Sequence, residues 1–405
     1  MKRFLLSFCI FFYLFSPYSL ADDNLLYEDL EPFTYSSTIQ SQNDLSTTYS
    51  SNICSIDRKS GIILYEKNLD QKVAIASTTK VMTCILALEN IDFNENPTFK
   101  ISKNAASATG STLGLKYNKT ISFKDLLYGL MLRSGNDCAI LIAEIISGDI
   151  ENFSKLMNDK ANKLGLKNTN FITPHGLDSE QHYSTAYDLA ILTDYALKND
   201  IFKQIVSTKN ITITLNDQPH EIHNTNELLG VLPGIYGVKT GFTFNAGRCL
   251  VTAYKNETFD IITVVLGANS KSIRSKDTKT VINYINNNYT YVNIENTINK
   301  TFNNYLNILP KNINLYKTNT KPEFYLEKLS NYSFPVKNIN TQNFSFKLYI
   351  RPYFSNHTPQ NSIVGKLSVY NEYKLYSSLN IYLKNNLVSN NINYYFFNSF
   401  KNIKF

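Results

Sequence analysis

Two hydrophobic periodicities divide this chain and limit the folds that it can adopt. In the middle of the chain apolar residues recur at helical spacing, as Val81, Ile85 and Leu88 do at i, i+4 and i+7. Runs typical of β-strands lie before and after that part. Helices placed between strands in this way predict an α+β domain, with a helical cluster packed on a mainly antiparallel sheet.

The expected elements follow from these patterns and from their end signals. Thr185 and Asp188 form a capping box before one helix, and Gly165 ends another. Asp137 stands where it would cap the helix that follows it. Helices are predicted from Ser77 onward and over residues 123–132, 138–146, 153–164, 189–196 and 272–284, and strands over residues 53–57, 62–65, 211–215, 235–239, 249–254 and 261–266.

The length of the chain allows two domains. The 405 residues include 43% hydrophobic ones, enough for a sizeable core. The elements above assign residues 51–288 to a main domain. Beyond residue 292 helical periods are few, and short segments alternate apolar and polar side chains. We expect a small all-β domain, a β-sandwich, over residues 292–388, with strands over residues 344–350, 363–369 and 379–382.

The first residues have the features of an export signal. Lys2 and Arg3 form a basic start, residues 4–15 are apolar, and Ser19 and Ala21 are the small residues that a signal peptidase reads. The apolar run is short for a membrane span, and an uncleaved anchor is the alternative. We expect a signal peptide over residues 1–21, a polar flexible leader over residues 22–50, and an exported protein of the cell envelope, at the outer face of the cytoplasmic membrane, in the periplasm or outside the cell.

Charge and cysteine content argue against several classes of protein. The formal charge of +7 is spread along the chain rather than gathered in one stripe, so we expect no nucleic-acid partner and at most attraction to an anionic envelope surface. The cysteines outside the signal peptide have no CxxC spacing, which predicts buried free thiols, with disulfides as the alternative. His175 and His182 have no carboxylate pattern beside them, so neither a metal nor another cofactor is expected. The four cysteines are Cys54, Cys84, Cys138 and Cys249.

Three short motifs carry the chemistry, and the first joins a hydroxyl to an amine. Ser77 and Lys80 are three residues apart, so on a helix they share one face and can meet. A serine needs a base within hydrogen-bond reach to act as a nucleophile, and a lysine serves only when its surroundings favour the neutral amine. At a helix start the backbone N–H of Ser77 would also point at a developing oxyanion.

The second motif, Ser134-Gly135-Asn136, separates two predicted helices. Its side chains can therefore project into a cleft, where Ser134 can relay a proton between Lys80 and a leaving nitrogen. The amide of Asn136 can hold Lys80 and a substrate carbonyl together.

The third motif, Lys239-Thr240-Gly241, ends a predicted strand. A strand edge can pair with an extended peptide, and Gly241 allows the backbone to approach closely. Lys239 offers a positive charge to a C-terminal carboxylate, and Thr240 and Thr243 offer hydroxyls. The N–H of Phe242 is placed to complete an oxyanion hole with that of the nucleophile.

The three motifs together are more specific than any one of them. Ser-x-Asn recurs at Ser41 and Ser50, whereas the ordered set, at spacings of about 55 and 105 residues, is a strong signal. At these residues the chain resembles the penicillin-recognising serine enzymes. Longer segments make it similar to the low-molecular-mass D-Ala-D-Ala carboxypeptidases of peptidase family S11. This resemblance covers about residues 50–288, notably 76–83, 132–137, 175–177, 184–190 and 237–243, and is weaker at 363–367.

The resemblance implies a fold, a reaction and roles for the motif residues. The main domain would have the penicillin-binding, β-lactamase-like serine transpeptidase fold. Ser77 would attack the carbonyl between the last two D-alanines of a peptidoglycan stem pentapeptide, with Lys80 as general base and Ser134 as proton relay. D-alanine would leave, water would hydrolyse the acyl-enzyme, and β-lactam antibiotics would inhibit by acylating Ser77. The implied substrate-binding residues are Asn136, Lys239 as the carboxylate anchor, Thr240, Gly241, Phe242 and Thr243.

Neighbouring activities stay open at this point. A class A β-lactamase would need a Glu-x-x-Leu-Asn segment between the second and third motifs, and residues 137–238 contain none. A large transpeptidase usually carries a long N-terminal domain, which is not expected here. A DD-endopeptidase is chemically close. A catalytically silent penicillin-binding sensor would keep the motifs behind a blocked cleft.

The last residues, 389–405, mix aromatic side chains with Lys401 and Lys404. Members of the family often carry a C-terminal amphipathic segment that lies on the membrane, and this composition fits such a peripheral anchor. The alternative is a last strand of the β-domain. The segment is too short and too polar to span a bilayer.

Overall fold

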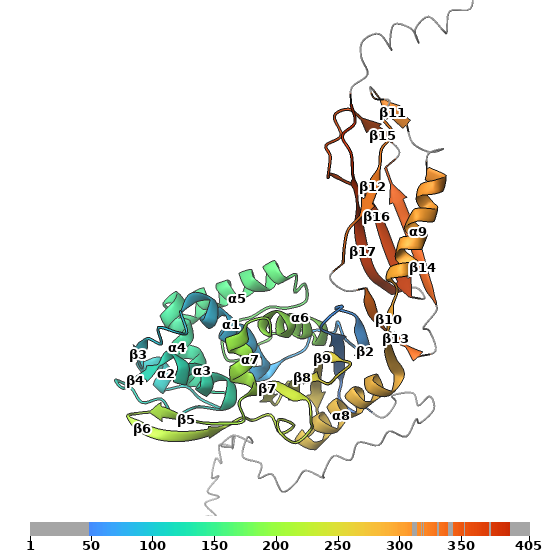
Figure 1. Cartoon of the computed structure of the whole chain (residues 1–405). Helices are drawn as coiled ribbons and strands as arrows, with labels where there is room; N and C mark the ends of the chain where they lie inside the picture. Colours follow the sequence, from blue (N-terminus) through green and yellow to red (C-terminus); the bar gives the residue numbers. More distant parts are fainter. Residues whose placement is uncertain are drawn as a thin grey trace, which may run out of the picture.

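The computed structural model describes residues 48–309, 314–316, 318, 320–329, 332–338, 343–351, 353–371 and 374–388. The predicted signal peptide, nearly all of the predicted leader and the predicted tail lie outside the described residues. A part with a sheet and most of the helices is followed by an elongated part that begins near residue 289 (Figure 1). No helix of the described ranges has both the length and the apolar character needed to cross a bilayer.

Five antiparallel strands form the central sheet of the first part. They are, in spatial order, β2 (Ile63–Lys67), β1 (Asn52–Asp57), β9 (Asp260–Ala268), β8 (Gly247–Lys255) and β7 (Ile235–Thr243). Successive side chains of a strand point to opposite faces, so Cys54 and Ile56 pack into one hydrophobic core and Ile53 into the other. The edge strand β7 carries the third motif.

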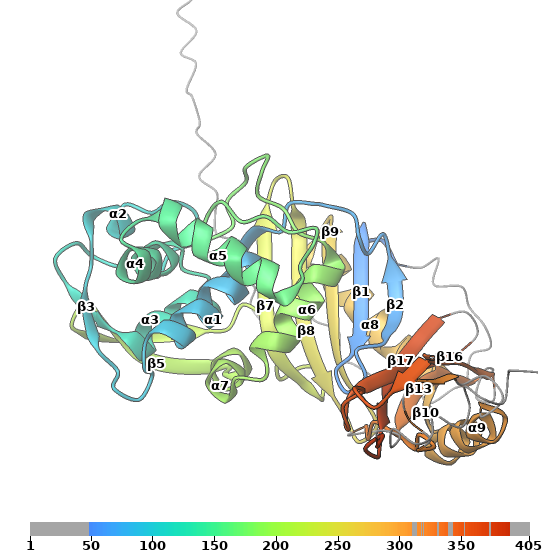
Figure 2. The same cartoon turned by 90° about the horizontal axis from the view of Figure 1, so that it is seen from above.

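Helices cover both faces of this sheet, as Figure 2 shows. The first face holds η2 (Ala76–Thr79), α1 (Lys80–Asn90), α2 (Lys103–Ala106), α3 (Phe123–Leu132), α4 (Asn136–Ser147), α5 (Ile150–Leu164), α6 (Ala186–Ala196) and α7 (Asp200–Ser207). Helix α8 (Lys271–Asn288) covers the opposite face. Two small two-stranded sheets border the helical cluster, β3 (Thr98–Lys100) with β4 (Thr120–Ser122) and β5 (Asn210–Leu215) with β6 (Gln218–His223).

The α+β class predicted from the sequence is confirmed, and so are the end signals of two helices. Thr185 Oγ1 accepts the N–H of Asp188 at 3.0 Å at the start of α6. Gly165 ends α5 in the left-handed conformation, with a φ of 73°. The four cysteines outside the predicted signal peptide are buried free thiols.

The elongated part consists mainly of strands. Strand β10 (Tyr289–Asn293) pairs with β13 (Ser333–Lys337), and β11 (Asn314–Tyr316) with β15 (Tyr353–Ser355). A four-stranded sheet has the order β12 (Phe324–Leu326), β17 (Lys374–Leu383), β16 (Ile363–Asn371), β14 (Phe344–Ile350). The sequence did not predict helix α9 (Glu295–Ile308), which packs Ile298 and Phe302 into the same core as this sheet. Its Asn and Thr residues are weak helix formers, so packing rather than propensity stabilises it.

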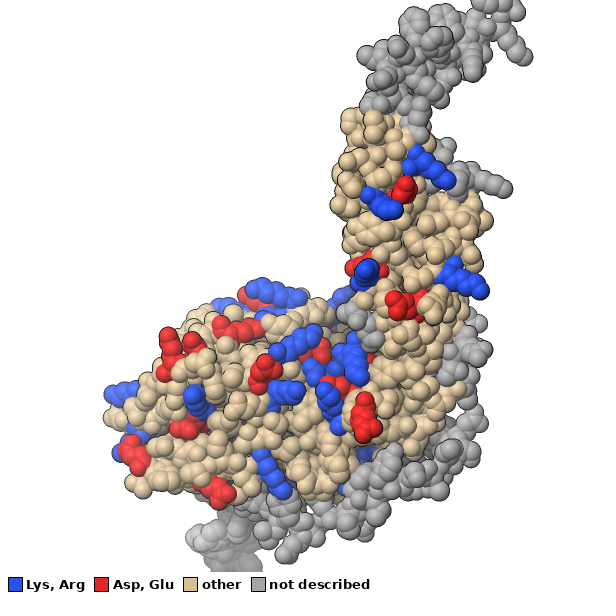
Figure 3. Space-filling model, viewed as in Figure 1, with Lys and Arg blue, Asp and Glu red and all other residues tan. Residues whose placement is uncertain are grey.

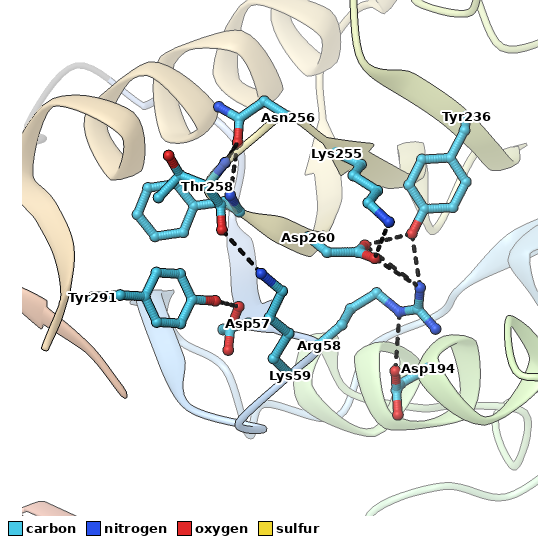
Figure 4. A network of polar contacts seen from close by, with 11 residues as sticks. Asp57, Arg58, Lys59, Asp194, Tyr236, Lys255, Asn256, Thr258, Asp260 and Tyr291 are labelled. Atoms are coloured by element: carbon cyan, nitrogen blue, oxygen red, sulfur yellow. Dashed lines mark hydrogen bonds and ion pairs between the residues drawn. The ribbon is translucent and has the colours of Figure 1, made fainter. Parts of the chain in front are cut away.

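A polar network ties the two parts together at one end of the sheet (Figure 4). Arg58, in the turn between β1 and β2, donates to Asp194 of α6 at 3.0 Å and to Asp260 of β9 at 3.3 Å. Beside it, the hydroxyl of Tyr291 from β10 donates to Asp57 of β1. The elongated part is therefore hydrogen-bonded to the sheet directly.

Candidate active site

The first motif lies where η2 passes into α1. Lys80 Nζ donates hydrogen bonds to Ser77 Oγ at 2.8 Å, to Asn136 Oδ1 at 2.7 Å and to the carbonyl of His175 at 3.0 Å. The lysine side chain is fully buried. The hydroxyl and the amine of the first motif therefore meet, and the amine also contacts the second motif.

The second motif forms the turn between α3 and α4. Ser134 is 3% exposed and has a φ of 60°, which is uncommon for a residue other than glycine. The amide nitrogen of Asn136 donates to the carbonyl of Thr109 at 2.7 Å. This bond orients the amide so that its oxygen faces the lysine.

Asp137 does not cap α4, and that prediction is wrong. The helix begins at Asn136, two residues earlier than predicted, so Gly135 occupies the N-cap and Asp137 lies inside the first turn. The Asp137 carboxylate instead accepts the backbone N–H groups of a loop beside the site. Its loop donors, at 2.8–3.0 Å, are Leu113, Gly114 and Leu115, and the N–H of Cys138 within α4 donates at 2.9 Å.

The third motif runs along the edge strand β7, against the first motif. A Cβ added to Gly241 would lie 3.1 Å from both the backbone nitrogen of Ser77 and the Cβ of Ala76. A side chain here would therefore push strand and helix start apart by a few tenths of an ångström, which glycine avoids. Lys239 is 1% exposed, and its Nζ donates to the carbonyl of Thr240 at 2.9 Å.

The end of β7 differs from the expectation in one respect. The hydroxyl of Thr243, expected to bind substrate, donates to Asp178 at 2.6 Å and accepts the N–H of Ala246 at 3.0 Å. Phe242 is 37% exposed, and the guanidinium of Arg248 lies 3.6 Å from the centre of its ring. The hydroxyl of Thr243 is therefore already hydrogen-bonded to a carboxylate.

Several residues of the site had no role in it assigned from the sequence. The carbonyl of His175 holds the lysine, Asp178 holds Thr243, and Thr225 places its hydroxyl 2.7 Å from that of Thr240. Asn226 supports β7 by donating to the carbonyl of Gly237 at 2.9 Å. The available signal for His175 was that residues 175–177 resemble a segment of the family.

The two buried histidines are neutral groups within this structure. Burial, together with the charge of Lys80, lowers the pKa of His175 to about 3, and burial lowers that of His182 to about 4. Within the described part of the chain, no three His, Cys, Asp or Glu side chains are grouped to hold a metal ion. His220 and His223 lie exposed on β6.

A model of peptidase family S11, described as D-alanyl-D-alanine carboxypeptidase, matches residues 37–270, which is more than half of the chain. The chain belongs to this family. Among curated S11 relatives, it is 38% identical over 233 residues to D-alanyl-D-alanine carboxypeptidase DacF of Bacillus subtilis, covering 56% of this chain and 60% of that protein. With DacC of Escherichia coli the identity is 36% over 242 residues, covering 56% and 59%. The chain thus spans about 60% of the length of these relatives.

The fold agrees with the S11 assignment. The structure resembles that of penicillin binding protein 5 from Haemophilus influenzae with a TM-score of 0.69 and 26% identity, covering 84% of this chain and 97% of that one. The similarity therefore extends beyond the residues that the family model matches.

Proposed function

We propose that the protein is a serine D-Ala-D-Ala carboxypeptidase, which removes the C-terminal D-alanine from peptidoglycan stem pentapeptides through an acyl-enzyme on Ser77. One observation carries this proposal: a fully buried lysine amine lies 2.8 Å from a serine hydroxyl and 2.7 Å from Asn136. Membership of the S11 family supports the same reaction. The relatives named above are D-alanyl-D-alanine carboxypeptidases.

In this proposal Lys80 is the general base. Burial disfavours the charged form of an amine, and the neutral amine has the lone pair that takes the proton of Ser77 as its oxygen attacks. The amide oxygen of Asn136 and the carbonyl of His175 accept from the same nitrogen. They hold it in place before the transfer and stabilise the ammonium after it.

Two backbone N–H groups would stabilise the oxyanion. One belongs to Ser77, at the start of η2, where the first N–H groups have no partner within the helix. The other belongs to Phe242, one residue after Gly241. The close approach of Gly241 to the nitrogen of Ser77 supports this pairing, because it brings the two backbones together.

The stem peptide would lie extended along β7. Its terminal carboxylate would meet the ammonium of Lys239 and the hydroxyl of Thr240. Thr243 is a weaker candidate for this contact, since its hydroxyl already binds the carboxylate of Asp178, and two carboxylates repel each other.

The acyl transfer would proceed in two steps. The Ser77 oxygen bonds to the substrate carbonyl carbon, the C–N bond breaks, and the proton that Lys80 took from Ser77 passes through Ser134 to the nitrogen of the departing D-alanine. Water then attacks the ester carbonyl carbon and gives a proton to Lys80, the C–O bond to Ser77 breaks, and Lys80 returns the proton to the Ser77 oxygen, which releases the shortened peptide as a carboxylic acid. A β-lactam would acylate Ser77 in the same way, with the leaving nitrogen still tethered to the acyl group.

The cellular setting is part of the proposal. Export by residues 1–21 and peripheral membrane contact through residues 389–405 rest on the sequence alone. Over the described residues of the face in Figure 3, cationic and anionic side chains are interspersed without a single basic stripe. This distribution is not typical of a nucleic-acid-binding surface.

Release of D-alanine from a stem pentapeptide tests the proposed function. Ser77→Ala should abolish release, and Lys80→Met should lower it about 10²-fold to 10⁴-fold through loss of the general base. Lys103→Met, at an exposed lysine of α2, is the matched control and should leave release unchanged. Cleavage of cross-linked peptides in preference to the pentapeptide would favour an endopeptidase, and rapid penicillin turnover a β-lactamase. If neither D-alanine release nor a penicillin adduct is observed, the catalytically silent sensor is the remaining alternative.

A further inference from the structure

The peptide unit between Ala76 and Ser77 is held at its carbonyl. Ala76 has a φ of 48°, which is uncommon for a residue other than glycine. Its carbonyl accepts a hydrogen bond from Thr79 Oγ1 at 2.8 Å. A peptide unit is planar, with its C=O and N–H pointing in opposite directions. Whatever fixes this carbonyl therefore also fixes the direction of the Ser77 N–H.

His182 determines the direction of the Thr79 hydroxyl. Its Nε2 lies 2.8 Å from Thr79 Oγ1. A carbonyl only accepts, so the single hydroxyl proton goes to Ala76, and Nε2 must be the donor toward Thr79. On the other side of the ring, Nδ1 accepts the backbone N–H of Ile172 at 3.0 Å and of Thr173 at 3.3 Å. The ring is thus neutral, with its proton on Nε2.

The imidazole is well placed to keep this tautomer. It is 2% exposed, and its edge packs on the ring of Phe171, with ring centres 5.8 Å apart. Burial lowers its pKa to about 4, so it stays neutral at neutral pH. Both ring nitrogens are used in hydrogen bonds within the protein.

We propose that His182 is a positioning residue for the oxyanion hole. Acting through Thr79 and the carbonyl of Ala76, it aims the Ser77 N–H at the oxygen of the tetrahedral intermediate. This inference rests on the proposed acyl transfer at Ser77. It assigns His182 a role in the acylation step rather than in substrate binding, since the residues that the ring contacts, Thr79, Ile172, Thr173 and Phe171, lie outside β7.

Two valine variants isolate the carbonyl contact. Thr79→Val removes the hydroxyl and preserves the shape of the side chain. Thr78→Val is the matched control, because Thr78 Oγ1 makes the same kind of bond, to the carbonyl of Ile75 at 2.6 Å, on the preceding peptide unit. Stopped-flow acylation by a penicillin separates the dissociation constant of the first complex from the acylation rate constant. Thr79→Val should lower the rate constant about tenfold to 100-fold, against about 10²-fold to 10³-fold for loss of a whole oxyanion donor, and the control should stay within about threefold.

Two histidine variants separate the two sides of the ring. The amide nitrogen of His182→Gln can donate toward Thr79 as Nε2 does, whereas the shorter His182→Asn offers its oxygen on the side of Ile172. We expect His182→Gln to keep most of the acylation rate and His182→Asn to lose as much as Thr79→Val. The infrared band of the acyl-enzyme ester carbonyl gives a second readout, because a well-directed N–H lowers its frequency. The band should shift to higher frequency in Thr79→Val and His182→Asn alone.

The inference is overturned if folded Thr79→Val acylates at the wild-type rate with an unshifted ester band. Equal losses in Thr79→Val and Thr78→Val would also overturn it, because they would reflect loosening of the whole segment. Circular dichroism establishes folding, and the infrared band is measured on folded acyl-enzyme at low temperature if a variant is unstable. If the wild-type protein forms no penicillin adduct, the proposed function itself is refuted. If the wild type is acylated and all variants are acylated at the same rate, only the role of His182 is refuted.

Discussion

Replacing Gly176 with alanine should disable the site without touching a catalytic side chain. An alanine Cβ at this position would lie 1.9 Å from the carbonyl oxygen of Ala76 and 2.7 Å from Thr79 Oγ1. Observed Cβ atoms essentially never approach other atoms within 3.0 Å, so the backbone must move by at least about 1.1 Å. The group displaced is the peptide unit that carries the Ser77 N–H.

The expected loss follows from that displacement. A misplacement of about 1 Å costs on the order of 10²-fold in rate, and overpacking costs about 1–3 kcal/mol of stability. The φ of 88° adds about 1–2 kcal/mol for any residue with a side chain. Gly165→Ala is the matched control, because Gly165 has a φ of 73° but no atom within 4 Å of the added Cβ. In the control, only the free-energy cost of the positive φ lowers the stability.

Acylation kinetics with a fluorescent penicillin and urea unfolding measure the two effects. We predict that Gly176→Ala loses about 10²-fold or more in the acylation rate constant and about 2–5 kcal/mol in the free energy of unfolding. Gly165→Ala should lose about 1 kcal/mol and acylate normally. Equal acylation rates in the two variants would show that the close approach of Gly176 does not position the nucleophile.

The remaining predictions concern stability. Arg274 and Glu227 form an ion pair at 2.8 Å, and their side chains are 2% and 9% exposed. Arg274→Met leaves the carboxylate buried without its charged partner and should lower the free energy of unfolding in urea by about 3–5 kcal/mol. The double variant Arg274→Met with Glu227→Leu should lose clearly less, because it removes both charges. Because the pKa of His182 is lowered to about 4, the unfolded chain binds an extra proton between pH 6.5 and pH 4. The contribution of His182 to the free energy of unfolding is therefore fully present above pH 6.5 and falls by about 2–3 kcal/mol by pH 4.5. His175 and Lys80 are the nearby titratable groups. If the free energy of unfolding falls with pH equally steeply in His182→Gln, the prediction is wrong.

Much of the site could be predicted because its first contact is local. Ser77 and Lys80 meet through helix geometry alone, and the order of the motifs identified their partners. The strands β7, β8 and β9 were also recognisable, because their apolar runs are bounded by turn residues.

The rest depends on contacts between distant segments. The hydrogen bond of His182 to Thr79 joins residues 103 positions apart, and the hydrophobic periodicity of the sequence does not predict such a contact. Asp137 was misassigned because a carboxylate near a helix start resembles a cap. Here the backbone N–H groups of a loop 22–24 residues earlier in the chain bind the carboxylate instead. Sequence patterns predicted the proposed reacting groups, and tertiary packing determines how their side chains are oriented.

The site of covalent modification by penicillin tests the central claim most directly. Intact mass spectrometry followed by peptide mapping should find one adduct, of the mass of the whole antibiotic, on the peptide that contains Ser77, and the adduct should form far more slowly in Lys80→Met. An unmodified wild-type protein, or an adduct on any other residue, would contradict the account.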